Sequence, residues 1–369
     1  MGRILAFTFP RISRRNDTIL IGSDRVDDPD ALVILDFLAE HSSRPLRWTA
    51  RGRPCFELLG SRAQERVVVA HEHTARSLMA YAQAQTIFHT AGLYTSPRPA
   101  RDRVVVTVWH GDGPKSASFP RIRGTYALTG VEHYSRIWAK FNGYPDESLL
   151  VTGRPRVDEL FRGKEERQFG GQDHLHKLAR LGLDERPVIW WLPTWRQNRR
   201  GHAISMDTGR SILMNLDADL LDRYQFVVKP HPLSAPSRWP EGWRVLNDSD
   251  FYENGIRLYQ ILGQAHAIVT DYSSVWTDFL NTNIPICFVF DDLEEFNQAR
   301  GFMDSEWNQK LPGPIIQSRS EFTEFVEQGW VREHADRRKE IADQLGAANT
   351  VGATARLFQA LDASGVEWS

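Results

Sequence analysis

Short runs of apolar residues recur along the chain and alternate with stretches whose apolar residues repeat every three or four positions. Most of the runs are continuous and rich in β-branched or aromatic residues, which is typical of strands covered on both faces of a parallel sheet. They lie at residues 66–70, 104–109, 188–192, 226–228, 267–270 and 285–290. Each run therefore predicts a strand.

The intervening stretches predict helices. One begins at Asp28-Pro29-Asp30, where Asp28 suits a helix cap and Pro29 the first helical position. Leu32, Leu35 and Leu38 then give that helix an apolar face. Further helices are expected at 73–84 and 333–345. Strands that alternate with helices indicate an α/β fold in layers.

A polar segment at 164–172, with glycines at 163, 170 and 171, separates two such α/β patterns. We expect an N-terminal domain at 1–165 and a C-terminal domain at 166–369, both Rossmann-like and doubly wound. A last helix that packs back on the N-terminal domain is compatible with this division. Ligands of such sheets bind beyond the carboxyl ends of the strands, so the chemistry should follow strands.

Composition narrows the class of protein. The chain has 369 residues, 41% hydrophobic and 25% charged, as in ordinary soluble proteins, and a net charge of −2 that argues against nucleic acid as a partner. Two cysteines, Cys55 and Cys287, are too few for a disulfide framework. The first residues do not resemble a signal peptide, and the apolar runs are too short to span a membrane. We expect a cytoplasmic protein or one bound peripherally to the membrane's inner face.

Four motifs follow predicted strands. The first, at 109–115, reads W-H-G-D-G-P-K. His110 could accept a proton from a hydroxyl because an imidazole titrates near neutral pH. Lys115 could face an anionic substrate, and Asp112 lies between the two. A turn with an incidental histidine is the alternative.

The second and third motifs supply cations. Arg196, in P-T-W-R at 193–196, could fork onto a phosphate, although such arginines often face solvent. In K-P-H-P at 229–232, two prolines fix the directions of Lys229 and His231, which together could neutralise a diphosphate. A rigid surface turn is the alternative for that motif.

The fourth motif, T-D-Y-S-S at 270–274, precedes a predicted helix at 275–280. Thr270, Ser273, Ser274 and the helix N-terminus could donate hydrogen bonds to phosphate. Asp278 could accept hydrogen bonds from ribose hydroxyls. The alternative makes either serine a plain helix cap.

Other signals are missing from the sequence. It has no Walker loop, no nucleophile elbow, no G-x-G-x-x-G and no cysteine–histidine cluster with zinc spacing. The pair at 291–292 lies in an acidic loop, and we interpret it as solvated. No metal site and no required cofactor are therefore expected; a divalent ion remains compatible with the sequence.

In order and spacing these motifs resemble the CDP-glycerol glycerophosphotransferase family of teichoic acid synthesis. The family pattern is W-H-G-T-P-x-K, G-x-P-R-N-D, P-T-[FW]-R, K-x-H-P, T-D-Y-S-S, R-G-[FY] and P-G-P. The corresponding segments here begin at residues 109, 153, 193, 229, 270, 300 and 312. Three residues depart from the pattern: Asp112 replaces threonine, Gly113 stands where proline is expected, and Val157 replaces asparagine.

The resemblance implies a GT-B-like architecture with a CDP-alditol donor bound mainly by the C-terminal domain. An acceptor hydroxyl, on a lipid-linked saccharide or polymer, attacks the phosphate that bears glycerol, and CMP leaves. His110 matches the base, and His231 a second catalytic histidine beside the donor phosphates. The donor-binding matches are Arg196, Lys229, Thr270, Ser273, Ser274 and Asp278. Asp112 and Lys115 fall on the acceptor side, where an acid at 112 could raise the pKa of His110.

Three alternatives stay open: a CDP-ribitol-dependent transferase, a glycosyltransferase that uses a nucleotide sugar, and a binding module without turnover. The acceptor class implies contact with a membrane surface. The candidate segment is the N-terminus, where Phe7, Phe9 and Ile12 lie among arginines 3, 11, 14 and 15. Residues 3–9 are alternatively the first strand of the sheet.

Overall fold

The chain forms two compact units that exchange segments of sequence. The structure is a computed structural model that describes residues 15–52, 55–94, 99–109, 111–116, 121–168, 172–206, 208–209, 211–328 and 332–369. Unit 1 comprises residues 1–112, 118–159 and 348–369, and unit 2 comprises 113–117 and 160–347. The chain therefore changes unit four times.

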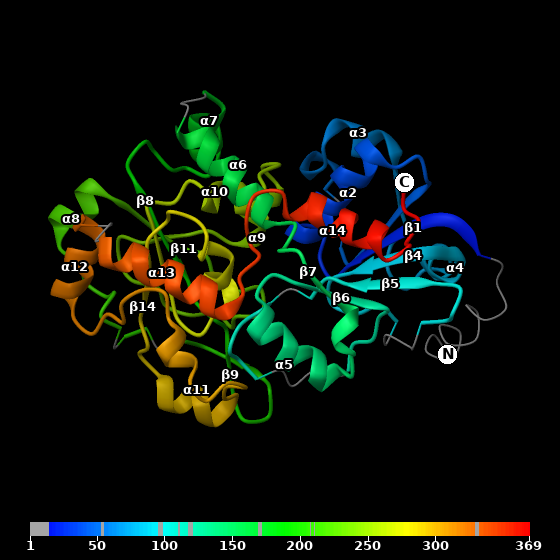
Figure 1. The fold of residues 1–369 in the computed structure, drawn as a ribbon. Coiled ribbons are helices and arrows are strands. Elements are labelled where there is room, and N and C mark those ends of the chain that lie inside the picture. Colours follow the sequence, from blue (N-terminus) through cyan, green and yellow to red (C-terminus); the bar gives the residue numbers. More distant parts are fainter. Residues whose placement is uncertain are drawn as a thin grey trace. The chain divides into compact units, whose positions relative to one another are not determined.

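Unit 1 contains a parallel sheet of seven strands in the order β3-β2-β1-β4-β5-β6-β7. Figure 1 labels β1, β4, β5, β6 and β7 of this sheet. The first six positions have the order of a doubly wound dinucleotide-binding sheet, in which the order reverses between β1 and β4. The strands are β1 (Asn16–Ser23), β2 (Leu46–Ala50), β3 (Val67–Val69), β4 (Ala84–His89), β5 (Val104–Thr107), β6 (Tyr126–Thr129) and β7 (Leu149–Val151).

Helices connect these strands. They are α2 (Pro29–His41), α3 (Ser61–Arg66), α4 (Ala75–Gln83), α5 (Glu132–Asn142), α6 (Val157–Gln168), which runs on into unit 2, α14 (Ala353–Ala363), and the 3-10 helices η1 (Phe56–Leu58) and η2 (Asp146–Ser148). The carboxylate of Asp28 caps α2 by accepting a hydrogen bond from the backbone N–H of Ala31, at 3.0 Å. The expected start of this helix is thus confirmed.

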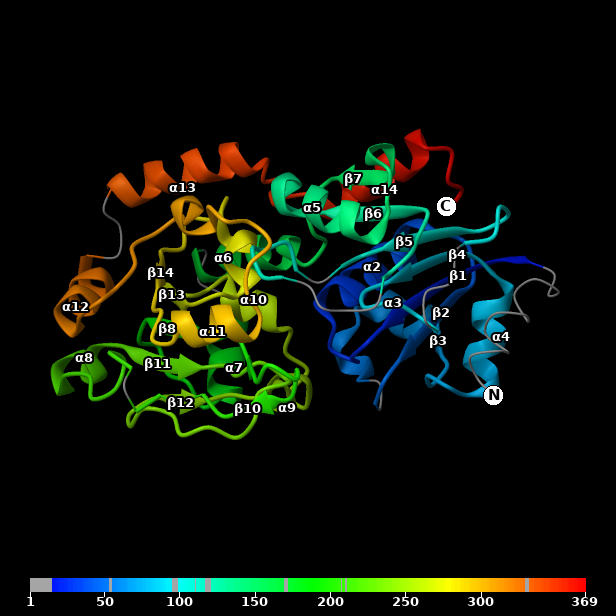
Figure 2. The ribbon, with the colours of Figure 1, turned by 90° about the horizontal axis from the view of Figure 1, so that it is seen from below.

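Unit 2 contains a second parallel sheet, in the order β12-β11-β8-β13-β14 (Figure 2). Counted within the unit this is the order 3-2-1-4-5, so the sheet is also Rossmann-like, and the order reverses between β8 and β13. The strands are β8 (Val188–Leu192), β11 (Gln225–Val228), β12 (Arg244–Val245), β13 (Ala267–Thr270) and β14 (Ile286–Phe288); β9 (Arg196–Gln197) and β10 (Ala203–Ile204) form a separate antiparallel pair.

Helices also connect the strands of unit 2. They are α7 (Gln172–Arg180), α8 (Ala218–Arg223), α9 (Asp248–Tyr252), α10 (Leu258–Leu262), α11 (Leu293–Ala299), α12 (Arg319–Gln328), α13 (Arg332–Leu345), and the 3-10 helices η3 (Ser274–Phe279) and η4 (Trp307–Lys310). No helix in the described part of the chain is both long enough and apolar enough to span a membrane.

The predicted strands and helices are found close to their expected positions. β8 and β13 match the expected ranges, and β3, β5, β11 and β14 lie within or beside theirs. β1 was missed, because its NDTILIGS sequence begins with three polar residues and ends with glycine and serine. The alternative first strand at 3–9 lies outside the described residues.

The end of the chain lies in unit 1. α14 packs on α2, where the Phe358 ring stacks on Phe37 with centroids 4.5 Å apart. The carboxylate of Asp158 accepts hydrogen bonds from the backbone N–H groups of Gly352, Ala353 and Thr354 at 2.8–3.0 Å, and so anchors the first turn of α14. The N-terminal part of unit 1 ends at residue 159, six residues before the expected boundary at 165.

Candidate active site

The carboxyl ends of β8 and β13 lie side by side at the point where the strand order of unit 2 reverses. Ligands of open α/β sheets bind at such points, because the helices that follow the two strands leave in opposite directions and open a crevice. The turn after β8 carries Pro193–Arg196, and the turn after β13 carries Asp271–Ser274. The second and fourth sequence motifs are therefore brought together here.

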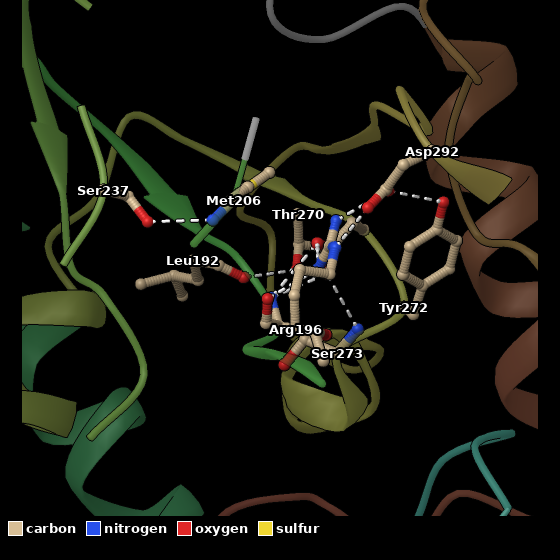
Figure 3. Close-up of polar contacts among 10 residues, drawn as sticks. Leu192, Arg196, Met206, Ser237, Thr270, Tyr272, Ser273 and Asp292 are labelled. Carbon is tan, nitrogen blue, oxygen red and sulfur yellow. Dashed lines mark hydrogen bonds and ion pairs between the residues drawn. The ribbon is translucent and has the colours of Figure 1, made fainter. Parts of the chain in front are cut away.

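Arg196 is held between two carboxylates (Figure 3). Its Nε and Nη2 donate to the two oxygens of Asp292, at 2.5 and 2.9 Å. Its Nη1 donates to Asp271 at 2.8 Å and to the Thr194 carbonyl at 2.5 Å. Burial opposes the charge on Arg196, but the two carboxylates outweigh it and raise its pKa. The Nε and Nη2 donors that were expected to bind phosphate are paired with Asp292. Arg196 therefore serves mainly to connect the turns that carry these carboxylates.

Asp271 joins the two turns. Its carboxylate, only 1% exposed, accepts hydrogen bonds from the backbone N–H of Thr194 at 2.9 Å and of Ser273 at 3.2 Å. Thr270 is fully buried, and its hydroxyl donates to the Leu192 carbonyl at 2.8 Å. Thr270 therefore ties β13 to β8 and does not offer its proton to a ligand, contrary to expectation.

Asp292 was interpreted as solvated, and that interpretation is wrong. Besides Arg196 it accepts a hydrogen bond from the Tyr272 hydroxyl at 3.1 Å. The Tyr272 ring stacks on Phe296 with centroids 4.0 Å apart, and the guanidinium of Arg196 lies 5.1 Å from the centre of the Tyr272 ring. A signal was present in the sequence: Asp292 follows the strand at 286–288 closely, as the other motifs follow theirs.

The serines lie at the entrance to η3. Ser273 is half-buried and its hydroxyl accepts a 3.4 Å hydrogen bond from the Val275 N–H, so it caps this helix. The predicted α-helix at 275–280 is instead a 3-10 helix of six residues, in which the Thr277 hydroxyl donates to the Ser274 carbonyl. Such a short helix has a weaker dipole than expected, which leaves less attraction for phosphate.

Asp278 is fully buried and accepts a 2.6 Å hydrogen bond from the Tyr259 hydroxyl. It therefore supports the interior of unit 2, and the expected contact with ribose is not available to its buried carboxylate. In the third motif the Lys229 ammonium is 7% exposed and pairs with Asp248 at 2.5 Å. The ring of His231 stacks on Trp195 of the turn after β8, with centroids 6.3 Å apart.

The first motif divides between the units. His110 lies outside the described residues. Asp112 belongs to unit 1, where its carboxylate is 4% exposed and pairs with Arg154, which is fully buried. It also accepts hydrogen bonds from the Gly130 N–H at 2.7 Å and the Ser135 hydroxyl at 2.9 Å. The Asp112 carboxylate is thus buried and bound by groups of unit 1. This differs from the expected contact of Asp112 with the acceptor substrate.

Lys115 belongs to unit 2, because residues 113–117 pack with that unit. This differs from the expected place of Lys115 on the acceptor side. Burial, together with the nearby charges of Arg300 and Arg196, lowers the pKa of its ammonium to about 7, and Asp271 opposes the shift. Within the described part of the chain, no group of three or more histidine, cysteine, aspartate or glutamate side chains is arranged to hold a metal ion.

The sequence matches the CDP-Glycerol:Poly(glycerophosphate) glycerophosphotransferase family over residues 9–357. The chain belongs to this family. Membership confirms both the family and the enzyme class that the motifs predicted, since the match covers nearly the whole chain.

Curated relatives of this glycerophosphotransferase are similar at a low level of identity. A teichoic acid glycerol-phosphate transferase of Staphylococcus aureus (strain NCTC 8325 / PS 47) is 25% identical, over 83% of this chain and 81% of the relative. A teichoic acid poly(glycerol phosphate) polymerase of Bacillus subtilis (strain 168) is 27% identical, over 63% of this chain but only 33% of the polymerase. A teichoic acid glycerol-phosphate primase of Bacillus spizizenii (strain ATCC 23059 / NRRL B-14472 / W23) is 25% identical, over 56% of each chain.

Solved structures show the same fold. The wall teichoic acid polymerase TagF has a TM-score of 0.73 at 17% identity, over 98% of this chain and 93% of that one. A UDP-GlcNAc 2-epimerase from Neisseria meningitidis has a TM-score of 0.56 at 11% identity, over 95% of this chain and 100% of the epimerase. These likenesses confirm the expected GT-B-like fold of the glycerophosphotransferase.

Proposed function

We propose that this chain transfers glycerol phosphate from CDP-glycerol to an acceptor hydroxyl and releases CMP, in the synthesis of a teichoic-acid-like polymer. The observation that carries the proposal is the family match over residues 9–357, together with two family motifs at the strand-order reversal of unit 2. The names of the relatives, all teichoic acid transferases, primases or polymerases, support the polymer class.

In the proposed reaction the acceptor oxygen attacks the phosphorus that bears glycerol. A new P–O bond forms as the bond from that phosphorus to the oxygen of CMP breaks, and CMP leaves with the bonding electrons. The proton of the acceptor hydroxyl passes to His110. Phosphoryl transfer needs positioning and charge stabilisation more than covalent help from the protein, so rigid turns and cations are suitable machinery.

The described residues supply such rigidity. Asp271 fixes the backbone of both turns, and Arg196 links Asp271 to Asp292. Turns that such contacts hold rigidly keep a bound phosphate in line for attack. We assign Ser274, Lys229 and His231 to the surroundings of the donor phosphates, with His231 kept in place by Trp195.

The test is incubation of the protein with a lipid-linked disaccharide acceptor and, in parallel, CDP-glycerol, CDP-ribitol or a UDP-sugar. CMP release and a product heavier by one glycerol phosphate are expected with CDP-glycerol. Turnover with CDP-ribitol but not with CDP-glycerol would show that ribitol phosphate is the transferred group. Release of UDP would favour the glycosyltransferase alternative. Binding of CDP-glycerol without turnover would indicate the inactive binding module. Assays with and without EDTA test the expectation that no cofactor is required.

The role of His110 has its own test. A general base contributes about 10²–10⁴-fold, so His110→Ala should lower kcat by that factor while the Kd for CDP-glycerol stays near that of the wild type. His133→Ala, which alters a histidine on α5, is the matched control and should keep its activity. Activity of His110→Ala within a few-fold of wild type would remove His110 from the mechanism.

Action at a membrane surface also stays a proposal. It rests on the lipid-linked acceptor, and most of the N-terminal segment offered as the contact lies outside the described residues. Arg15 is described, and it pairs with Asp102 at 3.2 Å and is 12% exposed, so it is less available to lipid than expected. Flotation with anionic liposomes tests the contact: Arg11→Glu with Arg14→Glu should reduce binding and its dependence on salt.

A further inference from the structure

The segment after Asp112 is built into unit 2 as a short antiparallel clamp. The backbone N–H of Ser116 donates to the Gly301 carbonyl at 3.1 Å, and that of Met303 donates to the Pro114 carbonyl at 2.8 Å. Lys115 and Phe302 form the antiparallel bridge between them. The backbone position of Lys115 is therefore fixed by hydrogen bonds on both sides.

This clamp lies directly against the turn after β13. A Cβ added to Gly113 would lie 2.5 Å from the Cβ of Ser274, which is closer than two carbons approach. Glycine thus permits a contact between backbone and turn that any side chain would block. The contact places Gly113, which precedes Lys115 by two residues, against Ser274 in the turn after β13.

Arg300 joins the same clamp to the turn after β8. Its Nε donates to the Ser116 carbonyl at 3.3 Å, and its guanidinium lies 5.6 Å from the centre of the Trp195 ring. Its Nη1 is buried and has no hydrogen-bond partner within the part of the chain that the structure describes. A buried N–H without a partner costs free energy, so such a group is suited to a ligand that supplies an acceptor.

Aromatic packing fixes the backbone that carries Arg300. The Phe302 ring stacks on Trp307 with centroids 4.2 Å apart, and Phe296 stacks on Tyr272 at 4.0 Å. Rings packed on both sides of Arg300 in the sequence hold its Cα in place. The guanidinium is thus presented from a rigid support, which lowers the entropy that binding would cost.

Two basic side chains at this place have no ion-pair partner among the described residues. The two carboxylates nearest to Arg196, those of Asp271 and Asp292, are both paired with it. Lys115 and Arg300 form no ion pair with any residue in the described ranges, yet Lys115 senses the charges of Arg300, Arg196 and Asp271. An arginine and a lysine that lack a counter-ion in the part of the chain that the structure describes are suited to an anion with more than one charge.

We propose that Lys115 and Arg300 are the pair that binds the diphosphate of the donor, a role that rests on the proposed function for the identity of that donor. Lys115 then acts on the donor side, and Arg196, the cation expected there, serves to position the turns. The donor class that the pair recognises is a nucleoside diphosphate ester.

Binding should be coupled to uptake of a proton. Free Lys115 titrates near pH 7 because burial and its arginine neighbours disfavour the charged form, whereas a bound diphosphate would favour it. The charged groups that face it are Arg300, Arg196 and Asp271. At pH 8 free Lys115 is mostly neutral, so most of one proton should be taken up with each donor molecule.

Calorimetry of CDP-glycerol binding in two buffers of different ionisation enthalpy measures both the Kd and the number of protons taken up. Lys115→Met and Arg300→Met should each raise the Kd by about 10- to 100-fold. Lys115→Arg should bind within a few-fold of wild type but without proton uptake, since arginine is always charged. Lys177→Met is the control: this lysine of unit 2 pairs with Glu166 at 3.0 Å, and its loss should change neither quantity.

Each outcome supports or overturns the assignment. Wild-type affinity in both methionine variants, with turnover intact in the wild type, would overturn the role of the pair and leave the proposed function standing. The wild type could fail to bind CDP-glycerol but bind pyrophosphate, with Lys115→Met abolishing that binding. This result would support the diphosphate-binding role of the pair and contradict CDP-glycerol as the donor. Should Lys115→Met fail to fold, the proton count of Lys115→Arg decides, because undiminished uptake in that variant would refute a role for Lys115.

Discussion

Removal of the Asp112 carboxylate should destabilise unit 1 strongly. Arg154 is fully buried, and its Nε donates to Asp112 at 2.9 Å. Asp112→Ala would leave the guanidinium in the interior without its counter-ion. It would also leave the Gly130 N–H and the Ser135 hydroxyl without their acceptor.

The size of the effect follows from these contacts. Breaking a buried ion pair by removing one partner costs about 3–5 kcal/mol, because the remaining charge stays buried and uncompensated. The two further hydrogen bonds belong to the same carboxylate, so their loss is part of this figure and is not added to it. Removing both charges with Asp112→Ala and Arg154→Met should cost less than either single change, since no isolated charge then remains.

Urea unfolding measures the difference. Trp109 and Trp138 stack in unit 1 with ring centroids 5.5 Å apart, so they contribute to the change in tryptophan fluorescence, as do the tryptophans of unit 2. Hydrogen exchange of the α5 amides assigns the loss to unit 1. The control is Asp146→Ala, whose carboxylate is exposed and pairs with the exposed Arg136, and which should change stability by less than about 1 kcal/mol.

A loss below about 1 kcal/mol in Asp112→Ala, or a double variant as unstable as the sum of the singles, would refute the reasoning. The result also bears on His110. If Arg154 compensates Asp112, the pH dependence of kcat should be the same in wild type and in Asp112→Asn wherever the variant is folded. A shift of that profile would support the expectation that Asp112 directly influences the pKa of His110.

Three further predictions concern other parts of the chain. Burial lowers the pKa of His89 to about 4 from 6.5. The contribution of the neutral ring to the free energy of unfolding is therefore complete above pH 6.5 and is lost as the pH falls toward 4. This loss should be about 3 kcal/mol in urea titrations and absent in His89→Gln. Gly113→Ala should push the clamp away from Ser274 and raise the Kd for CDP-glycerol several-fold, and calorimetry that shows wild-type affinity would contradict the close contact. Asp158→Ala should cost up to about 2 kcal/mol and speed hydrogen exchange in the first turn of α14, whereas unchanged exchange would mean that the cap is dispensable.

Much of the fold could be predicted because buried parallel strands have a strong local signature. β8 and β13 are uninterrupted apolar runs, and their limits were predicted to the residue. β1 lacks this signature, since polar residues begin it and Gly22-Ser23 end it. The return of α14 to unit 1 depends on contacts with α2 that lie more than 300 residues away in sequence, such as that of Phe358 with Phe37, and no local pattern encodes these.

The motifs located the site, but the partners of their side chains could not be predicted. Strand ends placed Arg196 and Asp271 in neighbouring turns, as parallel pairing requires. The sequence could not show that Asp292 would reach Arg196, because that contact depends on the path of the chain after β14. Lys115 was misplaced for a similar reason: hydrogen bonds with residues near 302 carry it into unit 2.

The four crossings of the chain set an order for folding during synthesis. Every residue of unit 2 has left the ribosome once Ala347 has emerged, whereas unit 1 still lacks α14. Until α14 has emerged, Phe37 on α2 lacks its contact with Phe358, and the carboxylate of Asp158 lacks the helix N-terminus that it caps. Domains generally complete in the order in which they are translated. Here the half that is translated first is completed last, and its apolar surface stays open to chaperones for the time needed to translate about 200 further residues, from 160 to the end of α14 at 363.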